Sequence, residues 1–115
     1  MSEEPPEILS VVADGATVRL IGELDPSGVA AATAALESAA LRSALESVDG
    51  EVAVDCSGLT FLDAAGLGVL VRAHRTCQAA GVELIVVDPA PCVTRLLALT
   101  GLDRYLAVRR ICESR

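Results

Sequence analysis

The feature that most constrains the fold is a short aliphatic run, VELIVV, at residues 82–87. Gly81 precedes the run as the expected left-handed end of a helix, and Asp88-Pro89 follows it. Because the run is almost continuously hydrophobic, it predicts a strand that is buried on both faces. Strands of this kind are typical of the parallel sheets found in α/β proteins.

Helix and strand signals alternate around this run. Two short strands, at residues 8–13 and 17–23, are separated by Asp14-Gly15, the strongest short-range signal for a tight hairpin turn. The other signals predict a helix over 29–48, a strand over 51–55, helices over 65–80 and 92–99, and a short last strand over 105–109. This order predicts an α/β sheet with parallel central strands and right-handed crossovers.

Local signals also predict helix starts and buried side chains. Asp25 or Ser27 can cap the first helix, with Pro26 in its first turn. After the strand at 51–55, Cys56-Ser57-Gly58 is expected to turn the chain, and the following loop to carry Leu59, Phe61 and Leu62 into the core. The buried face predicted for the first helix consists of Val29, Thr33, Leu36, Ala40, Leu41 and either Ala44 or Leu45.

Length and charge narrow the classes of function. A chain of 115 residues predicts one domain, which we place at residues 8–110 between a polar lead (1–7), expected to be disordered, and a charged tail (111–115). The net charge is −7, and the only aromatic residues are Phe61 and Tyr105. A basic surface and a base-stacking platform are therefore not expected, and nucleic acid is excluded as a predicted partner.

All nine basic residues are arginine, which removes mechanisms that need a lysine ammonium group. The N-terminus is acidic and lacks the features of a signal peptide. The apolar runs fall short of the roughly 18 residues that a membrane span requires. We therefore expect a cytoplasmic protein without membrane insertion. We also expect a monomer or a weak dimer.

The four cysteines, at positions 56, 77, 92 and 112, are not spaced like zinc ligands. No metal site, cofactor or catalytic residue is predicted. One interpretation treats the cysteines as small buried hydrophobic residues, and the other as the source of a regulatory disulfide. His74, the only histidine, lies on a line of apolar helix positions and is interpreted as a packed side chain rather than a general base.

The most informative stretch is DCSGLTFLDAAGLGVL at residues 55–70. Asp63 stands where a helix N-cap belongs, and Ala64-Ala65-Gly66 would form the first turn. Gly66 and Gly68 so early in a helix each cost roughly 0.5–1 kcal/mol relative to alanine. Two such residues indicate that something approaches the helix closely, either a backbone of the same domain or the surface of a partner.

In these residues the chain resembles the STAS family, and specifically its stand-alone anti-sigma factor antagonists. The resemblance extends from residue 8 to about residue 108. It rests on the order and spacing of GELD at 22–25, DCSGL at 55–59, FLD at 61–63, GLGVL at 66–70, PxVxRLL at 91–97 and TGL at 100–102.

The resemblance implies a STAS fold, with a mixed four- to five-stranded sheet, an N-terminal hairpin, parallel central strands and helices mainly on one face. It also implies a protein without enzyme activity that binds an anti-sigma factor with a GHKL-type kinase fold, and so releases a sigma factor for transcription. The residues that it assigns to the partner-binding face are Asp25, Asp63, Ala64, Ala65, Gly66, Leu67 and Gly68. An alternative with the same fold is a STAS adaptor subunit of a membrane lipid transporter, which docks on an ATPase.

One position departs from the family pattern. Typical members carry a hydroxyl residue directly after the capping aspartate, where the anti-sigma factor phosphorylates it. Here that degenerate phosphosite is Ala64, which has no hydroxyl, and the nearby Ser57 and Thr60 are interpreted as turn residues. Control by abundance and control by oxidation of a cysteine pair both stay open. The possible redox residues are Cys56, Cys77, Cys92 and Cys112.

Overall fold

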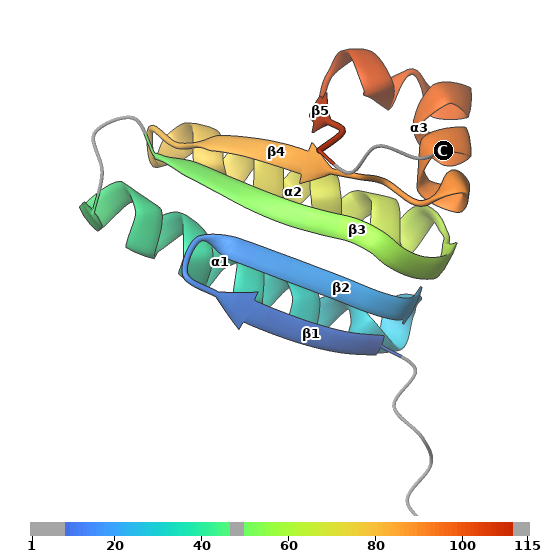
Figure 1. Ribbon diagram of the computed structural model, residues 1–115, viewed down its shortest axis with the longest axis horizontal. Coiled ribbons are helices and arrows are strands. Elements are labelled where there is room, and N and C mark those ends of the chain that lie inside the picture. Colours follow the sequence, from blue (N-terminus) through green and yellow to red (C-terminus); the bar gives the residue numbers. More distant parts are fainter. Residues whose placement is uncertain (1–8, 47–49, 112–115) are drawn as a thin grey trace, which may run out of the picture.

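The computed structural model describes residues 9–46 and 50–111, and its elements follow the predicted order (Figure 1). The strands are β1 (Leu9–Asp14), β2 (Thr17–Leu24), β3 (Glu51–Leu62), β4 (Glu83–Val87) and β5 (Ala107–Arg109). The helices are α1 (Val29–Glu46), α2 (Ala64–Ala79) and α3 (Pro91–Thr100), with 3₁₀ turns η1 (Pro26–Gly28) and η2 (Leu102–Arg104). The predicted lead at 1–7, the predicted helix end at 47–48 and Cys112 in the predicted tail lie outside the described residues.

The five strands form one mixed sheet in the order β1-β2-β3-β4-β5. β1 is antiparallel to β2, and β2 to β5 run parallel to one another. α1 and α2 pack against each other on one face of this sheet, whereas α3 packs at the end of β3 (Figure 1). The predicted fold class is therefore confirmed. We call the sheet face opposite α1 and α2 the open face.

β4 is buried on both faces, as its sequence predicts. Leu84 and Val86 belong to the core cluster that includes residues of the helices. Ile85 and Val87 alternate with them onto the open face and are also buried. The core consists almost entirely of leucine, valine and alanine side chains, and neither aromatic side chain belongs to it.

The hairpin between β1 and β2 forms one residue later than predicted. Asp14 still pairs with Thr17, so the two loop residues are Gly15 and Ala16. Gly15 has a φ of 62°, a conformation that glycine adopts without steric cost. A glycine with positive φ at the first central position is one of the patterns typical of tight two-residue hairpin loops.

β3 continues beyond Asp55, so the turn predicted at Cys56-Ser57-Gly58 is wrong. Two register shifts against β2, one after Asp55 and one after Leu59, each place an extra residue in β3. The bulges let glycine and serine remain in a paired strand. The prediction for Phe61 is also wrong, because this side chain lies opposite Glu23 and is 43% exposed.

The buried face predicted for α1 is confirmed at Leu36 and Ala40 and wrong at Leu41, which is 63% exposed. Of the two alternatives at its end, Ala44 packs against the core and Leu45 is 78% exposed. The buried side chains are Ala32, Leu36, Ala39, Ala40 and Ser43. A Cβ on Gly50 would collide with Ser43, so the end of α1 approaches the start of β3 very closely. Small residues permit this approach, which is why the helix turns its alanine side inward.

Candidate functional site

The ends of β2 and β3 bring two capping aspartates to one edge of the sheet. Leu24 and Leu62, the last residues of these strands, are partners in the parallel register. Asp25 and Asp63 follow them with nearly the same extended backbone, at φ −115° and −118° and ψ −175° and −169°. Asp63 caps α2 as predicted. Asp25, one of the two caps predicted for the first helix, caps instead the 3₁₀ turn η1 that leads directly into α1.

Asp25 is held in place by Ser27. The amide and the hydroxyl of Ser27 donate to Asp25 Oδ1 at 2.9 and 2.6 Å. The hydroxyl bond has the largest effect on the carboxyl and, against desolvation, lowers the pKa of Asp25. Asp25 therefore presents a negative charge at this edge at neutral pH.

Gly66 and Gly68 are needed for different reasons. A Cβ on Gly66 would lie 2.5 Å from Leu62 Cδ1 and 2.8 Å from the carbonyl oxygen of Leu24. The fold itself therefore requires Gly66. A Cβ on Gly68 would meet no atom of another element within 4 Å, and Gly68 is exposed. No contact within the described domain requires a glycine at position 68. Gly68 leaves the outer surface of α2 without a side chain at this position.

The surface at the start of α2 is formed by small side chains. Ala64 is exposed and Ala65 is half-buried, and neither carries a hydroxyl. Asp63 Oδ1 accepts the amide of Gly66 at 3.1 Å, which satisfies one of the free amides of the first turn. Leu67, by contrast, belongs to the core and is 7% exposed, so it contributes packing rather than surface.

Two exposed residues of this edge were absent from the sequence-predicted set. Glu23 and Phe61 are register partners on the open face, and both are exposed. Strand alternation is the signal that could have found them, since Phe61 and Leu62 cannot both face the core of a continuous strand. Because the predicted strand ended at Asp55, Phe61 was assigned to a loop, where strand alternation does not apply.

The first bulge of β3 carries a polar network. Asp55 Oδ1 accepts the amide and the hydroxyl of Ser57 at 2.9 and 2.7 Å, and Asp55 Oδ2 lies 3.5 Å from Arg19 Nε. Burial opposes ionisation, but the bonds from Ser57 and the charge of Arg19 outweigh it and lower the pKa of Asp55. The Thr60 hydroxyl donates to the carbonyl oxygen of Gly22 at 3.1 Å. Both hydroxyls thus stabilise the irregular strand.

The described cysteines differ in their access to solvent. Cys56 is fully buried, and burial, with smaller contributions from Asp55 and Cys92, raises its pKa to about 12. Burial also raises the pKa of Cys77. Cys92 is half-buried, and its thiol donates to the carbonyl oxygen of Leu59 at 3.6 Å. All three are free thiols, and Cys112 lies outside the described residues.

The single histidine, His74, is a packed side chain, and the described residues offer no cluster of metal ligands. His74 packs its ring edge against Tyr105, with ring centroids 4.5 Å apart, which agrees with a packed histidine. Within residues 9–46 and 50–111, no three His, Cys, Asp or Glu side chains gather as metal ligands. A helix with the length and apolarity to cross a bilayer is likewise missing from this part of the chain.

Comparison with solved structures places this fold among known ones. SpoIIAA, an anti-sigma factor antagonist solved in its unphosphorylated form, superposes with a TM-score of 0.66 and 22% identity, over 91% of this chain and 89% of SpoIIAA. The phosphorylated form of the Bacillus cell fate determinant SpoIIAA gives a TM-score of 0.63 and 20% identity, over 91% and 92% of the two chains. At these identities the similarity establishes the fold.

Sequence comparison establishes the family. The anti-sigma F factor antagonist of Paenibacillus polymyxa is 31% identical over 91 residues, which cover 79% of this chain and 74% of the relative. A family model described as "Mlab, STAS domain" matches residues 9–110, almost the whole described domain. The chain therefore belongs to the STAS domain family.

Proposed function

We propose that this protein is an anti-sigma factor antagonist without enzyme activity. It binds an anti-sigma factor with a GHKL-type kinase fold and so releases a sigma factor for transcription. The observation that carries the proposal is the 31% identity to the Paenibacillus polymyxa relative, which is named for that role. The STAS fold and the two capped helix starts at one sheet edge are consistent with a binding module.

The proposed partner-binding face is the edge formed by the end of β2 and the start of α2. Its residues are Asp25, Asp63, Ala64, Ala65, Gly66, Leu67 and Gly68. Gly68 supports this assignment most directly, because a helical glycine costs roughly 0.5–1 kcal/mol and no neighbour among the described residues requires it. A glycine there lets a partner's backbone come close to α2. Leu67 acts from the core by fixing the position of that turn.

Phosphorylation at the usual position is not part of the proposal, because Ala64 has no hydroxyl group. The hydroxyls of Ser57 and Thr60 are engaged in hydrogen bonds to Asp55 and Gly22, which argues against their use as substitute phosphosites. We therefore favour a constitutively active antagonist that is limited by its abundance. A phosphate at the start of α2 would add negative charge to the contact face, and a chain with alanine at position 64 cannot acquire that phosphate there.

Few of the cysteines are suited to a switch that works by oxidation in place of phosphorylation. The buried thiols of Cys56 and Cys77 have raised pKa values, so they are protonated and protected at neutral pH. Cys92 is the one partly accessible thiol among the described cysteines. A redox switch would therefore have to start at Cys92 or at Cys112.

Binding to a purified kinase-like anti-sigma factor tests the proposal. Asp63→Arg and Gly68→Glu should abolish binding while the domain stays folded. Leu45→Glu is the matched control for Gly68→Glu, because it adds the same charge to the exposed side of α1, where Leu45 is 78% exposed. Undiminished binding by both face variants, with the fold intact, would show that the assigned face is wrong.

A second candidate is a STAS adaptor subunit of a membrane lipid transporter. It is retained because the matching family model is described as "Mlab, STAS domain", without reference to a sigma factor. An adaptor would dock on an ATPase, so the two candidates differ in their partner. Co-purification with a transporter ATPase, and none with a kinase-like anti-sigma factor, would favour this second function.

A further inference from the structure

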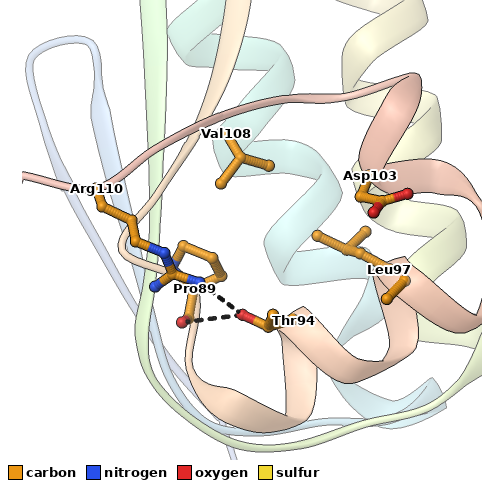
Figure 2. A pocket seen from close by; sticks show the side chains of 7 residues that line it. Pro89, Thr94, Leu97, Asp103, Val108 and Arg110 are labelled. Atoms are coloured by element: carbon orange, nitrogen blue, oxygen red, sulfur yellow. Dashed lines mark hydrogen bonds between the residues drawn. The ribbon is translucent and has the colours of Figure 1, made fainter.

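A groove between α3 and β5 is lined by none of the residues of the proposed partner-binding face. It consists of two adjoining hollows of about 210 and 470 Å³, which share Pro89, Thr94 and Arg110. Figure 2 shows the smaller hollow, bounded by α3 on one side and by the chain around Val108 on the other. We call this whole feature the α3–β5 groove.

The smaller hollow is largely apolar. Pro89, Leu97, Ala98 and Val108 line it. Figure 2 places Arg110 and Asp103 on opposite sides of this hollow. An apolar cavity of about 150 Å³ can hold a benzene molecule, so a hollow of 210 Å³ has room for a short alkyl or aromatic group.

The larger hollow is basic. Arg95 and Arg110 both line it, together with Pro89, Pro91 and Thr94. Arg110 Nη2 donates to Thr94 Oγ1 at 3.1 Å, and Thr94 Oγ1 donates in turn to the carbonyl oxygen of Pro89 at 3.5 Å. This chain of hydrogen bonds orients the Arg110 guanidinium beside Thr94 and Pro89 (Figure 2), the residues with which it lines both hollows.

Neither arginine forms an ion pair within the part of the domain that the structure describes. The ion pairs there join Arg19 to Asp55, Arg72 to Glu37 and Arg109 to Glu51, and Arg95 and Arg110 take part in none of them. In a chain with a net charge of −7, two such arginines on one hollow form a local positive site. An oriented guanidinium next to an apolar hollow is the arrangement of a ligand site.

We propose that the α3–β5 groove binds a phosphate monoester that carries a short apolar group. Two guanidinium forks offer two positive charges and paired donors, which match a phosphate dianion with three terminal oxygens better than a singly charged carboxylate. The apolar group lies on Ala98 and Val108, the exposed apolar residues of the smaller hollow. The Asp103 carboxylate repels the phosphate from the far side and so sets the orientation of the ligand.

Titration of the full chain with n-butyl phosphate, followed by amide chemical shifts, tests this site. We expect saturable shifts in residues 91–97 and 108–111, and weaker binding of inorganic phosphate, which has no apolar group. Arg95→Gln and Arg110→Gln should each weaken the binding of butyl phosphate by about tenfold. Arg75→Gln is the matched control, because it removes the same charge from an exposed position on α2.

The source of the phosphate is distinguished by a second arm with vesicles that contain phosphatidic acid. Binding of the free ester alone indicates a soluble ligand, and binding of the vesicles alone indicates a lipid headgroup. The proposal is overturned if neither probe binds, if inorganic phosphate binds as tightly as butyl phosphate, or if Arg75→Gln weakens binding as much as Arg95→Gln. Arg95 and Arg110 are exposed, so their variants should keep the dispersed spectrum of the folded domain.

Discussion

The carbonyl oxygen of Leu24 lies against Gly66 of α2, 2.8 Å from the place that a Cβ would occupy. This contact joins the last residue of β2 to the first turn of α2, without an intervening side chain. It sets the spacing between the two segments that carry Asp25 and Asp63. The geometry of the proposed partner-binding face therefore depends on one buried glycine.

Alanine substitutions at the two glycines of α2 should have opposite effects on stability. Gly66→Ala would drive its Cβ into backbone and side-chain atoms of Leu24 and Leu62, and should lower the free energy of unfolding by roughly 1–3 kcal/mol. Gly68→Ala meets open space and should raise it by roughly 0.5–1 kcal/mol. Urea denaturation of both variants measures this difference, and equal effects would contradict it.

The Asp63 cap should contribute to stability separately from its role in binding. Asp63→Ala removes the acceptor for the Gly66 amide and should cost about 1 kcal/mol. Asp63→Asn keeps a cap of similar strength and should cost much less. If denaturation shows the same loss for Ala and Asn, the carboxylate acts through its charge rather than through this hydrogen bond.

The sequence predicted the fold well because its signals are local. The caps at Asp25 and Asp63 and the helix ends at Gly81 and Gly101 depend on single residues whose conformations are intrinsic, and both glycines adopt a φ near 75°. The continuous aliphatic run of β4 likewise identifies a buried strand without any information about its neighbours.

Features that depend on neighbouring elements were not predictable in this way. Whether Ser57 and Gly58 end β3 or form a bulge depends on the pairing with β2, which adds no signal to the sequence of β3. The exposure of Phe61 follows from the same bulges. In α1, alanines on several sides give weak contrast between faces, so Leu41 was wrongly predicted to be buried.

The network around Asp55 should make stability depend on pH in the acid range. Folding lowers the pKa of Asp55 below its ordinary value of 3.8, so the contribution of the charged form is fully present above that value. It is lost as the pH falls through the lowered value in the folded protein. Asp55→Asn should therefore destabilise the domain at neutral pH, and its difference from the wild type should shrink with acidification. If the difference in free energy of unfolding between Asp55→Asn and the wild type stays constant as the pH falls, the charge of Asp55 has no role in stability.

The three described cysteines should differ in reactivity. Cys92 is half-buried, whereas Cys56, with a pKa of about 12, and Cys77 are buried thiols. Brief alkylation of the native protein with iodoacetamide, followed by peptide mapping, should modify Cys92 well before the other two. Alkylation of all three at the same rate would mean that the core opens on the timescale of the experiment.

If the proposed function holds, Ala64→Ser should restore the hydroxyl that the resemblance to anti-sigma factor antagonists implies at this position. Ala64 is exposed and directly follows the Asp63 cap, so a serine hydroxyl there would be accessible to a kinase-like partner. Incubation with the cognate anti-sigma factor and ATP should add one phosphate to the variant and none to the wild type, as measured by intact mass. Ala65→Ser, one residue further along and half-buried, is the matched control and should stay unmodified.

Phosphorylation of Ala64→Ser should also weaken binding to the anti-sigma factor. The phosphate would lie among the free amides of the first turn of α2, where its two negative charges would repel an acidic partner surface. Its bulk would also keep a partner away from the nearby Gly68, which has no side chain. The phosphorylated variant should therefore release the anti-sigma factor that the wild type retains. Retention by the phosphorylated variant would mean that this turn lies outside the contact.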